Sequence, residues 1–159
     1  MQAVTNVVVS LVGSMHQTLL APIDDSDEAF EAARHAVSLA AAFDAVVHVL
    51  YVMESKPAYT SVGYSGLQDE MAQERYREHA EEKIERVLDV AEQQGVDYRT
   101  EIKGGIPHVK IVKYADEVDA DGIVMGARGH GWGGVTDVML GSTTQRVIRN
   151  TSMPVTTVQ

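Results

Sequence analysis

Residues 121–134 read DGIVMGARGHGWGG, and residues 140–144 read LGSTT. The first segment begins with a short apolar run, Asp121–Met125, which predicts a buried strand. The second segment opens residues 142–150, whose sequence predicts a helix. A strand, a glycine-rich loop and a helix in this order present free backbone N–H groups to a phosphate.

Length and composition indicate one acidic globular domain. The chain has 159 residues, of which 45% are hydrophobic, enough to bury a sizeable core. The formal net charge of −10 argues against a nucleic-acid partner and against binding to anionic membranes, because both need clustered lysine and arginine. There is no cysteine, which excludes disulfides, thiol catalysis and thiolate metal sites.

Residues 1–14 are predicted to be an extension of the domain at 15–159. They contain a short apolar run but no lysine or arginine, so they make a poor signal peptide. Two explanations remain open: a loosely held N-terminal tail, or upstream sequence with Met15 as the native start. The apolar runs of the chain are also far shorter than the ~20 residues that span a bilayer. We therefore expect a cytoplasmic protein.

Strand and helix signals alternate along the chain. Expected strands cover residues 18–23, 45–52, 96–103, 123–125 and 153–158, and expected helices begin near Ser26, Leu67, Ile106 and Ser142. This alternation predicts an α/β fold with a five-stranded parallel sheet, doubly wound, and right-handed crossovers. Ligands of such sheets bind beyond the carboxyl ends of the strands, where the strand order reverses.

Each expected helix has an apolar face at spacings of three and four residues. These faces consist of Phe30, Ala33, Val37 and Ala40; Met71, Tyr76, Ala80, Ile84, Leu88 and Ala91; Val109, Ile111, Val112 and Ala115; and Val147 and Ile148. We expect the first strand to fray at Pro22, which cannot donate to a ladder. His48 is interpreted as a hydrogen-bonded interior histidine in preference to a metal ligand. Residues 54–66 form either a lid or a surface excursion.

Residues 129–134 match the dinucleotide-binding pattern G-x-G-x-x-G when taken literally. That fingerprint opens the first strand–helix unit of its fold and is followed about 20 residues later by an acidic residue. Here the match follows the fourth expected strand, and no Asp or Glu occurs after Asp137. The chain also lacks the P-loop pattern G-x-x-x-x-G-K-[ST]. We therefore predict neither an NAD site nor a P-loop.

A more extensive match joins Gly126-x-x-Gly129 to Gly141-Ser142. It resembles the signature of the universal stress protein family, which is G-x-x-G, nine residues and then G-[ST]. Further motifs of that family follow one another from about Met15 to Val158. They are LAPID at 20–24, HV at 48–49, GIPH at 105–108, VMG at 124–126 and PV at 154–155. The resemblance implies a Rossmann-like, adenine nucleotide alpha hydrolase-like (HUP-type) fold.

The resemblance also implies an adenine nucleotide, ATP or AMP with an accompanying Mg²⁺. Asp24 would approach the ribose or adenine, and Val49 would contact adenine through its backbone. The other pocket residues would be Pro22, Met125 and Gly126, and the phosphates would lie against Arg128, Gly129, Gly141, Ser142 and Thr143. Glycine allows close backbone approach, and a helix N-terminus favours an anion, so these residue types suit the chemistry.

The chain departs from the family signature in one place. Eleven residues lie between Gly129 and Gly141, where the signature has nine. The two extra residues fall around Trp132, in the part of the loop expected at the phosphates. A loop that merely turns the chain is the alternative interpretation. The retained start of the last helix, Gly141–Thr143, favours phosphate binding.

We predict a nucleotide-binding regulatory module that acts in a stress response as a homodimer, paired through the last strand, Val155–Val158. No catalytic residues and no metal ligands are predicted, and His130 is interpreted as an exposed loop residue in preference to a proton donor. Two alternatives stay open. The first is a stress protein that binds other proteins and no nucleotide. The second is an enzyme, such as a slow ATPase, although the H-x-G-H motif of adenylyl-transferring relatives is absent.

Overall fold

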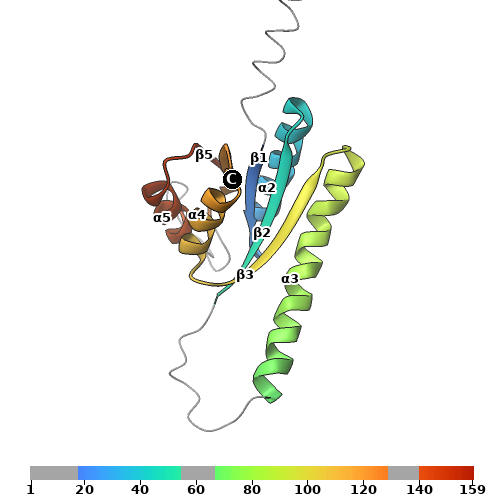
Figure 1. The fold of residues 1–159 in the computed structure, drawn as a ribbon, viewed down its shortest axis with the longest axis vertical. Coiled ribbons are helices and arrows are strands. Elements are labelled where there is room, and N and C mark those ends of the chain that lie inside the picture. Colours follow the sequence, from blue (N-terminus) through green and yellow to red (C-terminus); the bar gives the residue numbers. More distant parts are fainter. Residues whose placement is uncertain (1–17, 55–66, 129–139) are drawn as a thin grey trace, which may run out of the picture.

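The computed structural model describes residues 18–54, 67–128 and 140–159 (Figure 1). Within these ranges, five strands alternate with four helices, which confirms the predicted α/β fold. The elements are β1 (Thr18–Ile23), α2 (Asp27–Phe43), β2 (Val46–Glu54), α3 (Leu67–Gln93), β3 (Tyr98–Gly105), α4 (Pro107–Glu117), β4 (Gly122–Gly126), α5 (Ser142–Asn150) and β5 (Val155–Val158).

The five strands form one parallel sheet in the order β3-β2-β1-β4-β5. The chain builds outward from β1 to β2 and β3, and then returns to the other side of β1 to add β4 and β5. The strand order therefore reverses between β1 and β4. The boundary between β1 and β4, at the carboxyl ends of the strands, is the switch point where doubly wound sheets bind ligands.

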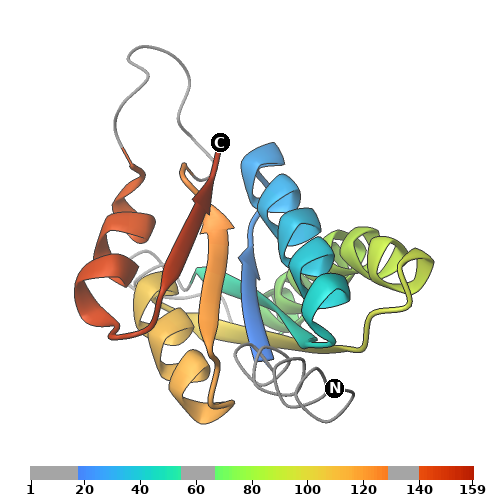
Figure 2. The same ribbon diagram turned by 90° about the horizontal axis from the view of Figure 1, so that it is seen from above.

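Helices cover both faces of the sheet, as Figure 2 shows. Helices α2 and α3 pack on one face, and α4 and α5 pack on the other. Strand residues alternate between the two resulting cores: Ala21 and Val124 face α2 and α3, whereas Leu20 and Ile123 face α4 and α5. All four side chains are buried, as expected for a parallel sheet with two covered faces.

Local signals set the helix ends as predicted. The hydroxyl of Ser26 accepts a hydrogen bond of 3.1 Å from the backbone N–H of Ala29 and so caps α2. Pro107 occupies the first turn of α4, where its missing N–H costs nothing. Gly95 follows α3 with a φ of 67°, a conformation that glycine adopts without strain.

The end of β1 differs from the expectation. The strand does not fray at Pro22, which stays in register with Leu50 of β2, and the ladder continues to Ile23. The register with β4 ends three residues earlier, at Leu20. Beyond Leu20, β1 is paired with β2 and no longer with β4. The missing N–H of Pro22 therefore costs no ladder hydrogen bond to β4.

Some of the predicted inward-facing residues are exposed. Met71 and Tyr76 are 62% and 60% exposed, because the amino-terminal half of α3 runs past the end of the sheet (Figure 1). A helix of 27 residues spans about 40 Å, whereas the eight residues of β3 span about 26 Å. Val109 of α4 and Ile148 of α5 are also exposed, while Tyr114 of α4 is buried where no apolar position was expected.

Candidate functional site

The candidate site lies at the carboxyl ends of β1 and β4. Asp24 follows β1 directly, and Gly126 ends β4. Helix α2 begins shortly after β1, and α5 is the next helix after β4. Two helix N-termini, with their positive dipole ends, therefore lie near the switch point.

Asp24 is half-buried and holds the turn into α2. Its Oδ1 accepts a hydrogen bond of 2.8 Å from the backbone N–H of Ser26 and a second from the hydroxyl of Ser26. The same hydroxyl caps α2. The structure thus places Asp24 at the predicted edge of the sheet, and it gives this carboxylate a positioning role at the start of α2.

The two ends of the glycine-rich stretch are tied together. The backbone N–H of Gly141 donates to the carbonyl of Ala127 over 2.8 Å, and Ala127 itself donates to the carbonyl of Val158 over 2.7 Å. The hydroxyl of Thr144, which is buried, donates to the carbonyl of Gly126 over 3.0 Å. These bonds fix the start of α5 against the end of β4.

Thr144 was absent from the sequence-based set of site residues. Its position in the first turn of α5, directly after Ser142 and Thr143, was the available signal. Gly129 and the two extra residues around Trp132 lie outside the described residues, as does His130.

Gly126 lies in tight packing between elements. A Cβ atom at this position would lie 3.0 Å from the backbone nitrogen of Ala29, 3.0 Å from the carbonyl oxygen of Arg128 and 3.1 Å from the carbonyl carbon of Glu28. All three are backbone atoms, which cannot swing aside as the end of a long side chain can. The first turn of α2 therefore packs directly on the end of β4, and this accounts for the glycine without a ligand.

Among the described residues, no side chain caps the N-terminus of α5. Gly141 is its N-cap residue and makes no side-chain capping bond, and the first turn contains no acidic residue. Ser142 is exposed and Thr143 is half-buried at this end of the helix. The first N–H groups of a helix have no partner within it, so an external acceptor can take the place of a cap.

Arg128 places an unsatisfied donor in the same region. Its Nε lies 4.0 Å from Oε1 of Glu28, too far for a hydrogen bond. This Nε atom is buried and has no hydrogen-bond partner among the described residues. A buried guanidinium N–H without an acceptor is costly, and an oxygen of a bound phosphate would satisfy it.

Three other predicted residues lie inside the sheet. Met125 is buried in the core beside α4 and α5, so only its backbone is available at the edge. Val49 is fully buried and pairs with Ala21, two positions before the level at which β1 ends. Pro22 is buried between these levels. The structure thus brings Asp24, Gly126, Arg128 and the start of α5 to the carboxyl edge of the sheet. Met125, Val49 and Pro22 lie within the sheet.

His48 has a structural partner. Its Nδ1 lies 3.2 Å from the hydroxyl oxygen of Tyr114, which agrees with the predicted hydrogen-bonded histidine, and the side chain is half-buried. Burial lowers the pKa of His48 below its ordinary value, and the positive charge of Arg99 lowers it further. The described residues contain no group of three or more histidine or acidic side chains arranged to hold a metal ion.

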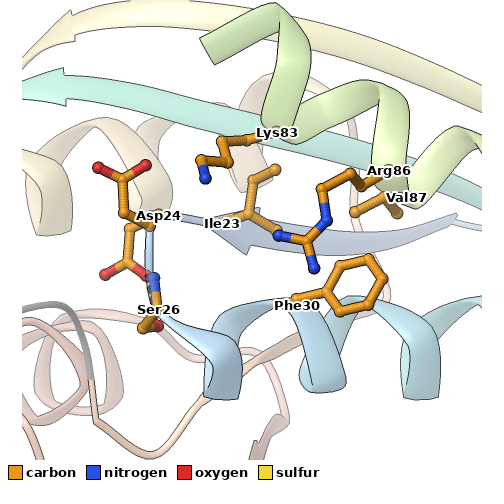
Figure 3. Close-up of a pocket in the computed structure, with 8 residues that line it drawn as sticks. Ile23, Asp24, Ser26, Phe30, Lys83, Arg86 and Val87 are labelled. Carbon is orange, nitrogen blue, oxygen red and sulfur yellow. Dashed lines mark hydrogen bonds between the residues drawn. The ribbon is translucent and has the colours of Figure 1, made fainter. Parts of the chain in front are cut away.

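A small cavity lies beside the site, between the end of β1 and helices α2 and α3 (Figure 3). Its volume of about 10 Å³ is at the lower limit for one water molecule. The side chains of Lys83 and Arg86 reach into this region from α3, and the guanidinium of Arg86 stacks 4.3 Å from the ring centre of Phe30. A cavity of this volume holds at most one water molecule.

Fold and site together define a Rossmann-like α/β domain in which no described side chain caps the helix N-terminus near the switch point. Among the described helices, none has the length and apolar character to cross a membrane. The model of the universal stress protein family matches residues 15–159. The chain belongs to this family, and its fold is the HUP-type fold of these proteins.

Individual relatives match this chain over most of their own length. Universal stress protein MJ0531 of Methanocaldococcus jannaschii is 34% identical over 156 residues, which cover 98% of this chain and 89% of that protein. The structure of universal stress protein UspA from Lactobacillus plantarum is 29% identical, with a TM-score of 0.76 and coverage of 91% and 98%. A universal stress protein solved in complex with cAMP is 25% identical, with a TM-score of 0.62 and coverage of 91% and 97%.

Proposed function

We propose that this chain binds an adenine nucleotide, ATP or AMP, at the carboxyl edge between β1 and β4. The proposed binding residues are Pro22, Asp24, Val49, Met125, Gly126, Arg128, Gly129, Gly141, Ser142 and Thr143. In this proposal the phosphates lie at the start of α5 and the adenosine lies toward Asp24. Bound nucleotide would act as a signal in a stress response, with no catalytic step required.

The open N-terminus of α5 is the observation that carries the proposal. It offers backbone N–H groups and a positive dipole end, and the hydroxyls of Ser142 and Thr143 begin the same turn. The buried Nε of Arg128 adds a donor that has no acceptor among the described residues. An anion with several oxygens, such as a phosphate chain, satisfies both features in an otherwise acidic protein.

The relative solved with cAMP supports the adenine part of the proposal. That protein carries an adenine nucleotide on the same fold, with 25% of residues identical to this chain. The open helix start by itself is compatible with other phosphate compounds. The choice of adenine therefore depends on this relative and on the family motifs that the chain retains.

The proposal includes a cytoplasmic homodimer. Strand β5 pairs with β4 on one side and is the last strand of the sheet. Val155 and Val158 remain half-buried, and Thr156 and Thr157 are exposed. Pairing with β5 of a second copy would cover this edge, which otherwise offers unpaired N–H and C=O groups.

Thermal unfolding with ATP, AMP and cAMP tests the proposal. A nucleotide present at about 100 times its dissociation constant adds about 2.7 kcal/mol of stability. For a domain of this size, this corresponds to a rise in Tm of about 5–10 °C. Arg128→Gln should reduce the shift, whereas the control Arg34→Gln, on the exposed side of α2, should leave it unchanged.

Two results would contradict the proposal. If none of the nucleotides changes Tm at millimolar concentration, the chain acts through other proteins. If the purified protein releases phosphate from ATP above the background rate, it is a slow ATPase and the non-catalytic part of the proposal is wrong.

A further inference from the structure

The turn that follows β1 is held by several elements at once. It consists of Asp24, Asp25 and Ser26, and it joins β1 to α2 at the carboxyl edge of the sheet. Asp24 and Ser26 are hydrogen-bonded to each other, and the hydroxyl of Ser26 caps α2. Asp25, the middle residue, is bonded instead to side chains of β2 and α3. The turn is therefore a junction of α2, β2 and α3.

Two donors converge on one oxygen of Asp25. The hydroxyl of Tyr51, in β2, donates to Oδ1 of Asp25 over 3.2 Å, and Nε2 of His79, in α3, lies 2.7 Å from the same oxygen. A carboxylate only accepts hydrogen bonds, so Nε2 of His79 carries a proton. The rings of Tyr51 and His79 also meet edge to face, with their centres 6.5 Å apart. These bonds join residues that are 26 and 54 positions away from Asp25 in the sequence.

Tyr51 is a constant donor in this cluster of three side chains. Burial raises the pKa of its hydroxyl, and Asp25 raises it further through its charge and through the hydrogen bond. The charge of Asp24 acts in the same direction, because both carboxylates of the turn lie near the Tyr51 hydroxyl. Tyr51 therefore stays protonated at neutral pH and keeps its bond to Asp25.

His79 lies near the level at which α3 leaves the sheet. Ala80, the next residue, is fully buried, whereas Tyr76, one turn earlier, is 60% exposed. The side chains of His79 and Asp25 are 41% and 31% exposed, so their contact contributes little to the stability of the fold. Its effect is local: it fixes the middle of one turn relative to α3.

Net charge does not select a ligand at this turn. Two carboxylates, those of Asp24 and Asp25, and two cations of α3, Lys83 and Arg86, are among the residues that line the small cavity beside β1 (Figure 3). Because these opposite charges are equal in number, the cavity has no strong preference for an anion or a cation. Directional hydrogen bonds, those to Asp25, therefore hold the turn in one conformation.

We propose that Asp25, Tyr51 and His79 are positioning residues of the nucleotide site and set its selectivity for a nucleoside phosphate over a bare polyphosphate. This rests on the proposed function, in which the adenosine lies toward Asp24 and the phosphates lie at the start of α5. The cluster holds the turn that carries Asp24, so it acts on the adenosine end. The start of α5 is fixed to β4 by separate hydrogen bonds. A ligand without adenosine is therefore insensitive to the cluster.

Calorimetric titration of the full chain with ATP and with inorganic tripolyphosphate tests this selectivity. His79→Ala removes the donor from α3 and should weaken ATP binding by about three- to tenfold. The dissociation constant of tripolyphosphate should stay within about twofold. His79→Gln retains an N–H donor at the end of its side chain and should recover most of the ATP affinity. Tyr51→Phe, which removes the second donor, should act in the same direction as His79→Ala.

Two matched variants separate this effect from general changes. His35→Ala removes an exposed histidine of α2 and should change neither dissociation constant. Arg128→Gln, at the phosphate end, should weaken both ligands. The two His79 variants should unfold within about 3 °C of the original chain, because the contact with Asp25 is partly exposed.

Amide hydrogen exchange without any ligand tests the cluster independently of nucleotide. The backbone N–H of Ser26 donates to Asp24 across the turn over 2.8 Å. If His79 holds the turn, the exchange of this amide should become about three- to tenfold faster in His79→Ala. The slower rate should return in His79→Gln.

Four results would overturn the proposal. They are ATP binding that His79→Ala leaves unchanged, equal weakening of ATP and tripolyphosphate, no recovery in His79→Gln, and unchanged exchange of the Ser26 amide in His79→Ala. In the first three cases ATP still binds to the original chain, so the proposed function stands while this proposal fails. If ATP does not bind to the original chain, the proposed function is wrong and the selectivity falls with it.

Discussion

Gly126→Ala should destabilise the protein because the backbone of α2 and of Arg128 would have to shift to admit a methyl group. The added Cβ would approach the backbone of Ala29 and the carbonyl oxygen of Arg128 to 3.0 Å each, and the backbone of Glu28 to 3.1 Å. These contacts are tighter than ordinary van der Waals separation, and each involves backbone that moves only with its element. Overpacking of this kind costs about 1–3 kcal/mol.

The matched control is Gly122→Ala in the same strand. A Cβ there would lie 3.6 Å from the carbonyl oxygen of Pro154 and 3.7 Å from a side-chain atom of Leu19, which are ordinary contact distances. This substitution should change stability by less than about 1 kcal/mol, since it also reduces the freedom of the unfolded chain.

Urea unfolding without nucleotide measures both free energies. We expect Gly126→Ala to lower the free energy of unfolding by about 2 kcal/mol, or Tm by about 4–8 °C. If Gly126→Ala is as stable as the control but loses nucleotide binding, the glycine serves the ligand and the packing explanation is wrong.

Two further substitutions and one pH dependence test individual hydrogen bonds and burial in the domain. Thr144→Val should cost about 1–3 kcal/mol in urea unfolding, because it leaves the buried carbonyl of Gly126 without its hydroxyl donor. Ser26→Ala should cost about 1 kcal/mol, because the N–H of Ala29 loses its cap. Burial, together with the charge of Arg99, lowers the pKa of His48 below its ordinary value of 6.5, so the folded state favours the neutral ring. Stability should therefore fall as the pH drops below about 6.5, and His48→Gln should flatten this dependence.

The two substitutions that remove a hydroxyl have matched controls. Thr143→Val removes a hydroxyl from the same turn of α5 and should cost less than Thr144→Val. Ser38→Ala, whose hydroxyl donates to a carbonyl one turn earlier on the exposed side of α2, should be close to neutral. An NMR titration that places the pKa of His48 above 6.5 would contradict its assigned environment.

Much of the fold could be predicted from the sequence because its signals are local. Ser26 and Pro107 mark helix starts, and β1, β2 and β4 are short runs too apolar for exposed positions. The errors concern tertiary context. Met71 and Tyr76 follow the apolar spacing of α3, but that part of the helix has no sheet beneath it.

The site was predictable in part for the same reason. The start of α5 at Ser142 follows from a local motif. The bond from Thr144 to Gly126 joins residues 18 positions apart, and the contact of Gly126 with the start of α2 joins residues almost 100 positions apart in sequence. Neither contact can be predicted from the spacing of residues in the sequence. The glycine was therefore predictable, but the reason for it was not.

The central claim is that phosphates bind at the start of α5. The most direct measurement is an NMR titration with ATP that follows the backbone amides of Ser142 and Thr143. The account predicts that these amides show the largest shifts among residues 140–159 and that Arg128→Gln weakens the titration. Unchanged amides at saturating ATP, or shifts centred on another part of the chain, would contradict it.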